Sequence, residues 1–148
     1  MSKTRIIIHI VFCTKNRKPT IPLTRKRELY KYIYGILRNK RCDLLRMNGL
    51  SDHIHLLINL HPSIALSDLI KEIKISTTLW MRNNDFFKGF EKWGEGYYGA
   101  SVGPEGEQTC INYILQQEEH HLGKDFLSEV KEMSLQHHLL WDERDWEV

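Results

Sequence analysis

The sequence predicts an α+β fold of the ferredoxin-like, split βαβ type, in which an antiparallel sheet carries helices on one face. The residue patterns follow the order β-α-β-β-α-β, with short β-branched runs alternating with longer amphipathic stretches. The two middle strands are separated only by the turn-forming stretch 48–52, which indicates a hairpin. Further helical patterns follow the last strand, so additional C-terminal helices are expected on this core.

The first half of the chain supplies three strands and one helix. Residues 4–14 are rich in β-branched side chains and predict a buried strand, which a proline-containing basic loop follows. Apolar residues recur at helical spacing over residues 24–40, which predicts an amphipathic helix. Residues 42–50 and 53–60 have the composition of the two hairpin strands.

The second half is predicted to be mainly helical. Its first helix has Leu79 among the positions expected to face the core. Pro104 suits the first turn of a later helix, because proline has no N–H to leave unbonded there. The expected elements are a helix over 66–84, a strand over 97–103, a helix over about 104–121 and a shorter helix over about 124–134.

Length and composition favour one domain over residues 1–148, divided into a sheet core (1–103), a helical part (104–134) and an acidic tail (135–148). The hydrophobic share of 41% is enough to bury a core. No apolar run approaches the roughly 20 residues of a membrane span, so no membrane partner is expected. Three widely spaced cysteines fit neither a disulfide framework nor a zinc knuckle, and we expect a cytoplasmic protein.

Charge is unevenly distributed along the chain. Residues 1–60 hold 13 Lys and Arg against 3 Asp and Glu, whereas residues 61–148 hold 8 against 16. A basic half suggests a polyanionic partner such as nucleic acid, unless the two halves interleave in space and neutralise each other. The basic residues around the first loop are candidate phosphate contacts, or members of a solvated loop: Lys15, Arg17, Lys18, Arg25, Lys26 and Arg27.

Two histidines stand one residue apart at the start of the second hairpin strand. Side chains alternate along a strand, so His53 and His55 share one face, and their spacing suits two ligands of one metal ion. The alternative is a pair of ordinary polar residues on a solvated sheet face. Asp52 could orient one imidazole from behind, or it could simply end the turn.

The third predicted helix offers groups that could complete such a site. At about 100° per residue, Tyr113, Gln117 and His120 share one stripe, while Leu115 lies off it and can pack on the sheet. A metal held by the two histidines and the Gln117 carbonyl would polarise a phosphate oxygen. Tyr113 could then attack the phosphorus if the cation or a base such as His120 activated its hydroxyl. The alternative is an exposed polar helix face.

These motifs, in this order, resemble the single-tyrosine HUH transposases (TnpA-like) of bacterial insertion sequences that move as single-stranded DNA. The resemblance extends to relatives associated with repetitive extragenic palindromes. The stretch "DHIHLLI" matches the family's His-hydrophobic-His motif, and "YILQQ" matches its Tyr-x-x-x-Gln helix motif. The stretches "HIVFCTKNRKP" and "WGEGYYGASVG" resemble the family's first strand with its loop and the segment before the tyrosine helix.

The resemblance implies a specific chemistry. The metal would be Mg²⁺ or Mn²⁺, and the enzyme would cleave and rejoin single-stranded DNA at insertion-sequence ends through a 5′-phosphotyrosine on Tyr113. The partners would be DNA with hairpin ends and a second subunit. In many members the tyrosine helix of one subunit completes the metal site of the other, although palindrome-associated relatives can be monomeric.

Two other functions stay open at the level of the sequence. The first is a metal-dependent nuclease in which water attacks the phosphorus and Tyr113 only binds substrate. The second is a non-catalytic hairpin-binding protein derived from a transposase. A covalent protein–DNA adduct that depends on Tyr113 would separate the transposase from both.

Overall fold

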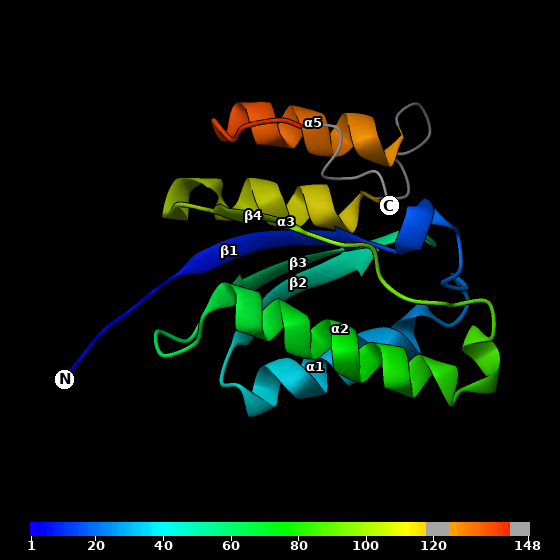
Figure 1. The fold of residues 1–148 in the computed structure, drawn as a ribbon. Coiled ribbons are helices and arrows are strands. Elements are labelled where there is room, and N and C mark those ends of the chain that lie inside the picture. The colour runs from blue at the N-terminus through cyan, green and yellow to red at the C-terminus, as the bar shows by residue number, and fades with distance from the viewer. Residues whose placement is uncertain (118–124, 143–148) are drawn as a thin grey trace.

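The computed structural model describes residues 1–117 and 125–142, and a four-stranded antiparallel sheet forms its centre (Figure 1). The strand order β2-β3-β1-β4 is that of the predicted ferredoxin-like split βαβ, which is therefore confirmed. Helices α1 and α2 connect β1 to β2 and β3 to β4. The bounds are β1 (Ile7–Cys13), α1 (Lys26–Asn39), β2 (Asp43–Gly49), β3 (His53–Asn59), α2 (Leu66–Arg82) and β4 (Tyr98–Ser101).

Two further helices lie on the sheet face opposite to α1 and α2 (Figure 1). Helix α3 (Glu107–Leu115) follows a short 3-10 turn, η3 (Pro104–Gly106), and the predicted limit of this helix at about His121 lies outside the described residues. Helix α5 (Phe126–Gln136) packs on the part of the sheet formed by β1 and β4. No helix in the described ranges is both long enough and apolar enough to cross a membrane.

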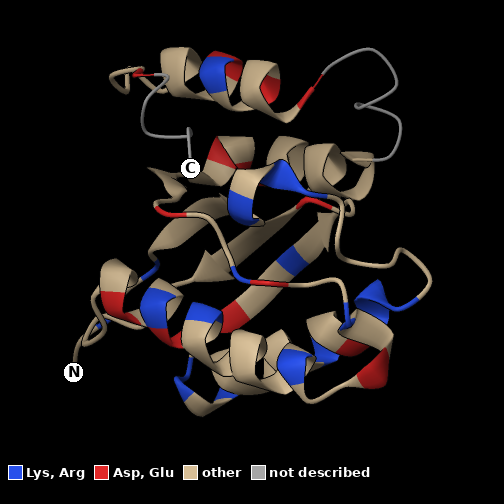
Figure 2. Cartoon of the chain, turned by 45° about the vertical axis from the view of Figure 1, so that its right-hand side comes forward, with Lys and Arg blue, Asp and Glu red and all other residues tan. Residues whose placement is uncertain are grey.

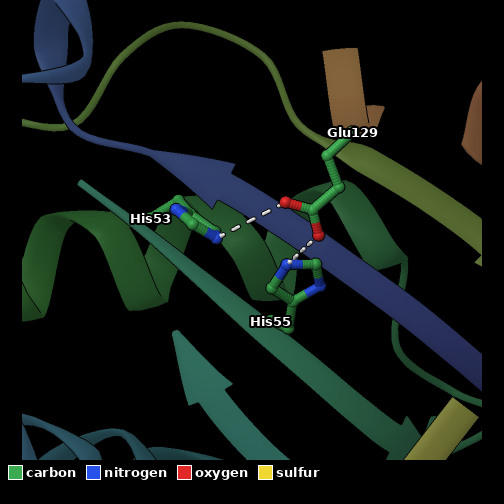
Figure 3. A group of neighbouring side chains, drawn as sticks. All are labelled: His53, His55 and Glu129. Carbon is green, nitrogen blue, oxygen red and sulfur yellow. Dashed lines mark ion pairs between the residues drawn. The ribbon is translucent and has the colours of Figure 1, made fainter. Parts of the chain in front are cut away.

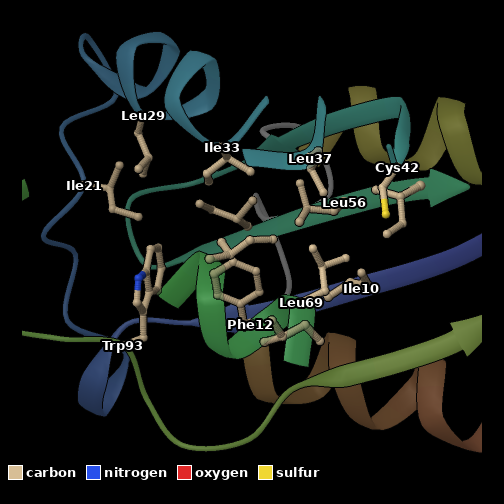
Figure 4. Packing of buried hydrophobic residues seen from close by; sticks show 14 of the residues in the cluster. Ile10, Phe12, Ile21, Leu29, Ile33, Leu37, Cys42, Leu56, Leu69 and Trp93 are labelled. Atoms are coloured by element: carbon tan, nitrogen blue, oxygen red, sulfur yellow. The ribbon is translucent and has the colours of Figure 1, made fainter. Parts of the chain in front are cut away.

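The core consists of two apolar layers because the side chains of the central strands alternate between faces. Ile10, Phe12 and Leu56 point toward α1 and α2 and pack there with residues of both helices (Figure 4). On the other face Val11 packs against Val130 of α5. Since β1 and β3 are the two inner strands, each is covered on both faces and has little contact with water.

Two apolar positions differ from the sequence prediction. Leu79 of α2 is 57% exposed, and Thr77 and Met81 point inward instead. Leu79 lies two residues, or about 200°, from Thr77, which places it on the opposite side of the helix. Leu115, predicted to pack on the sheet, is 48% exposed, because its neighbour Ile114 takes the inward position at the end of α3.

Charged residues from the basic and acidic parts of the chain meet in space, and Figure 2 shows both signs on the layer formed by α1 and α2. Exposed ion pairs of this kind contribute only about 0–1 kcal/mol each, but they neutralise local charge. The uneven charge of the sequence is thus partly compensated in the fold, as the interleaving alternative expected. The pairs that join the two parts are Arg5–Glu107, Lys18–Glu91 and Lys40–Glu72.

Gly49, at the end of β2, allows a close backbone approach that any side chain would obstruct. An added Cβ would lie 2.1 Å from the His53 carbonyl oxygen. We expect Gly49→Ala to lower the free energy of unfolding by about 3 kcal/mol or more, measured by urea denaturation. The matched control is Gly35→Ala, since a Cβ at Gly35 meets nothing within 4 Å. Alanine in the middle of α1 should stabilise the protein by about 0.5–1 kcal/mol. Equal effects of the two changes would contradict the close approach.

Candidate active site

Strand β3 places both histidines of the His-x-His motif on the sheet face covered by α3 and α5. His53 and His55 are each 0% exposed. The alternative of ordinary polar residues on a solvated sheet face is therefore wrong, because β3 lies inside the sheet with helices over it. Buried imidazoles require polar partners, and the partners come from three other segments.

Helix α5 contributes a carboxylate that the sequence reasoning missed. Glu129 Oε1 lies 3.0 Å from His55 Nε2, and Glu129 Oε2 lies 4.0 Å from His53 Nε2 (Figure 3). Glu129 is 3% exposed. One ligand atom from each of the three residues lies within 4.8 Å of the others. Two imidazoles and a carboxylate at this separation form a donor set that can hold one divalent metal ion.

Gln117, two residues beyond the end of α3, reaches the same point. Its Oε1 lies 2.9 Å from His53 Nε2, and its Nε2 donates a hydrogen bond of 3.1 Å to Glu129 Oε1. Asn48 of β2 positions this end of α3, because its Nδ2 donates to the carbonyl oxygen of Ile114 at 3.1 Å. The structure thus brings together three of the predicted residues, His53, His55 and Gln117.

Tyr113, in the last turn of α3, directs its hydroxyl into this group. The hydroxyl donates a hydrogen bond to Glu129 Oε1, and the tyrosine ring centroid lies 5.7 Å from that of His55. Burial, together with the hydrogen bond to the Glu129 carboxylate, raises the pKa of Tyr113 above its ordinary value. The phenol is therefore protonated at neutral pH in the metal-free protein. His120, the predicted helper, lies outside the described residues.

Each imidazole is held from behind by a second group. His53 Nδ1 lies 2.7 Å from Asp52 Oδ1, which brings the predicted outer carboxylate into contact. His55 Nδ1 lies 2.8 Å from Nε2 of His9, a buried histidine of β1 that the sequence reasoning did not select. Burial, then the neighbouring His55 ring, holds the pKa of His9 well below its usual range, so His9 is neutral at pH 7.

The basic first loop is anchored next to the start of β3. Its residues Lys15–Arg17 form a 3-10 turn, η1. The backbone N–H of Thr14 donates to the Asp52 carbonyl oxygen at 2.9 Å, and the Thr14 hydroxyl donates to the Lys18 carbonyl oxygen at 2.7 Å. The turn and the Asp52–His53 pair are therefore tied together through one threonine.

The predicted basic residues further along the chain have partners within the fold. Arg25 pairs with Glu28 at 2.8 Å and lies over the Phe86 ring, 3.5 Å from its centroid. Lys26 Nζ donates to Asn48 Oδ1 at 3.0 Å, which supports the residue that caps α3. These contacts give Arg25 and Lys26 a structural role. Arg27 follows them in the first turn of α1.

A sequence signal for Glu129 did exist. It lies on the same helical stripe as the apolar residues Phe126, Val130 and Met133, all of which are buried. An acidic side chain on the apolar stripe of a helix costs free energy unless it meets a partner. The signal for His9 was weaker, since it was only a polar residue inside a strand predicted to be buried.

Comparison with known proteins places this geometry in one family. The model of the family described as "Transposase IS200 like" matches residues 2–117. The transposase for insertion sequence element IS200 of Salmonella typhimurium strain LT2 is 27% identical over 122 residues, which cover 78% of this chain and 80% of that protein. The corresponding transposase of Salmonella typhi matches with the same values.

Solved structures have the same fold. A REP-associated tyrosine transposase bound to a REP hairpin superposes with a TM-score of 0.64 at 17% identity, covering 99% of this chain and 91% of that chain. A candidate transposase from Deinococcus radiodurans R1 superposes with a TM-score of 0.60 at 19% identity, covering 78% of this chain and 93% of that chain. At these identities the likeness concerns the fold.

The environment of Tyr113 predicts a late ionisation of its phenol. In metal-free protein, Tyr113→Phe should leave the tyrosinate absorbance between about pH 9 and about pH 11 unchanged, because the raised pKa keeps this phenol protonated where an ordinary tyrosine ionises. The measurement is a spectrophotometric titration of both proteins. Repeating it in urea is the control, since unfolding exposes Tyr113 and should reveal the missing chromophore. A difference already present in the folded proteins would contradict the prediction.

Proposed function

This chain belongs to the IS200-like transposase family, and from that premise we propose that it cleaves and rejoins single-stranded DNA through a 5′-phosphotyrosine on Tyr113. One observation carries the proposal. The Tyr113 hydroxyl, two imidazoles, an amide and a carboxylate converge within one chain. Simple hydrolysis needs no protein nucleophile, so a tyrosine hydroxyl directed at a possible metal site favours strand transfer.

We propose that His53, His55 and Gln117 hold Mg²⁺ or Mn²⁺ and that Glu129 adds a carboxylate ligand. The described residues fit such an ion, because two nitrogen and two oxygen donors lie close together in a buried site. Hard cations favour oxygen ligands, so the carboxylate makes the donor set more suitable than imidazoles alone. A bound ion would supply Lewis-acid polarisation of the scissile phosphate.

The reaction proceeds by attack of the Tyr113 oxygen on phosphorus. The phenol proton passes to the Glu129 carboxylate, which already accepts the hydrogen bond from this hydroxyl. His120, predicted from the sequence, remains a second candidate for this proton. The bond from phosphorus to the 3′ oxygen breaks, and this oxygen takes up a proton from solvent water and leaves as a free 3′-OH. The phosphotyrosine conserves the energy of the phosphodiester, so a 3′-OH can later attack it without ATP.

The proposed substrate is single-stranded DNA with hairpin ends. A solved relative of the same fold is bound to a REP hairpin, which supports this class of partner. We assign phosphate contacts first to Lys15 and Arg17, because their turn is tied to the strand that carries His53, and then to Lys18, whose ion pair with Glu91 is exposed. Arg25, Lys26 and Arg27 belong to the same region, but contacts within the fold already occupy the first two.

We propose that the tyrosine acts in cis, on the metal site of its own chain. The contacts of Tyr113 with Glu129 and His55 are made within one chain, which supports this arrangement. A homodimer, expected from the family, is compatible with cis action.

Mixing a Tyr113→Phe protein with a His53→Ala protein distinguishes cis from trans action. Trans action would restore DNA cleavage in the mixture, and cis action would not.

Tyr113→Phe is expected to abolish the covalent protein–DNA adduct formed with single-stranded oligonucleotides of candidate element ends in Mg²⁺ or Mn²⁺. The phenylalanine retains the packing of the ring and removes only the nucleophilic oxygen. The readout is a shifted protein band on a denaturing gel. In Tyr113→Phe the rate of adduct formation should fall by at least about 10³-fold. The control Tyr34→Phe changes a tyrosine that is 49% exposed on α1 and should leave the adduct intact.

Three results would separate the candidate functions. Cleavage that persists without an adduct in Tyr113→Phe indicates a nuclease that uses water. Hairpin binding by the wild-type protein without any metal-stimulated cleavage indicates a binding protein. An adduct on the wild type that both Tyr113→Phe and His55→Ala lose supports the transposase chemistry.

Replacing Lys15 and Arg17 by glutamine is expected to weaken DNA binding about equally for all sequences. Each phosphate contact removed should reduce the steepness of log affinity against log salt by about 0.7 to 0.9, because fewer counterions are released. Fluorescence anisotropy over a range of salt concentrations measures the slope. The control Lys71→Gln removes an exposed charge on α2 and should leave it unchanged. An unchanged slope in the double variant would show that Lys15 and Arg17 make no phosphate contacts.

A further inference from the structure

His9 is a buried polar residue that the proposed chemistry does not yet use. It is 4% exposed and lies on β1, where it is paired with Leu57 of β3 and Ala100 of β4. His55 lies two residues before Leu57 on β3, so both point to the same face of the sheet. The side chain of His9, which is directly opposite Leu57, points to that face as well. A histidine in such a position, held between two strands and covered by helices, must have a polar partner to offset burial.

The partner is the imidazole of His55, one of the two histidines assigned to the metal. His9 Nε2 lies 2.8 Å from His55 Nδ1, and the two rings are nearly parallel at 24° with centroids 5.1 Å apart. A hydrogen bond between two imidazole nitrogens holds one proton, so one ring donates and the other accepts.

Metal binding decides which ring donates. An ion bound by His55 takes the lone pair of Nε2, the nitrogen that faces Glu129. A neutral His55 then carries its proton on Nδ1 and donates it to His9 Nε2, and His9 carries its own proton on Nδ1. The two metal histidines are thus held differently, because a carboxylate faces His53 and a neutral imidazole faces His55.

We propose that His9 is a positioning residue that accepts the Nδ1 proton of His55 and thereby presents His55 Nε2 to the metal ion. The inference rests on the proposed metal site and goes beyond it, since it assigns a role to a residue that acts through His55. The rings of Tyr98 and Tyr113 meet His9 edge-on at 5.6 Å and 6.3 Å, which keeps its own orientation defined. A neutral acceptor also adds no negative charge behind the ion.

The test measures Mn²⁺ affinity of the full chain without DNA, by electron paramagnetic resonance of free Mn²⁺. His9→Phe keeps a ring of similar size without an acceptor and should weaken binding roughly 10–100-fold, as removal of such outer partners does. His9→Gln can place an amide oxygen near the position of Nε2 and should restore most of the affinity. His137→Phe is the control, because His137 lies near the same Tyr98 ring but is exposed at the end of α5.

The outcomes separate this inference from the proposed function. Wild-type protein that binds no Mn²⁺ overturns both. If the wild type binds Mn²⁺ and His9→Phe binds it with the same affinity, the role of His9 alone is overturned. If His9→Phe and His9→Gln lose the same amount of Mn²⁺ affinity, His9 contributes only packing and the proposed hydrogen bond is overturned. Should His9→Phe fail to fold, ¹⁵N NMR of Mg²⁺-loaded wild type decides. A proton on His55 Nδ1 supports the inference, and a proton on His55 Nε2 overturns it.

Discussion

The structure depends on a carboxylate buried among hydrogen-bonding groups. Glu129 is 3% exposed, and it lies against the two imidazoles of β3 and against the Tyr113 phenol and the Gln117 amide at the end of α3. A buried charge is tolerated only when such partners surround it, because removal from water costs several kcal/mol. The relative positions of β3, α3 and α5 are therefore linked through one side chain.

The sheet and the helices have different parts in this arrangement. β3 is an inner strand covered on both faces, so the His53 and His55 rings are fixed by packing as well as by Asp52 and His9 behind them. Tyr113 lies in the last turn of helix α3 and Gln117 just beyond its end, where Asn48 holds the carbonyl end of the helix. Rigid elements thus carry the groups of the proposed site, which is what precise catalytic geometry requires.

The basic turn connects the proposed DNA path to this centre. Thr14 hydrogen-bonds both to the Asp52 backbone and to the Lys18 backbone, so a phosphate held by the turn would lie near the strand that begins with His53. Many basic residues of the first sixty instead support the fold. Lys26, for example, donates to Asn48, and Asn48 caps α3. Charge composition alone would have assigned both kinds of residue to DNA.

The sequence by itself determined the order of strands and helices along the chain, the shared face of His53 and His55, and the stripe that joins Tyr113 to Gln117, because these follow from local periodicity. Resemblance supplied the family. Only the tertiary structure decided that Glu129 and His9 lie against His55 and that Leu79 is exposed while Met81 is buried. Such contacts join residues far apart in the sequence, and they depend on how one element is rotated and seated against another. No local pattern contains that rotation.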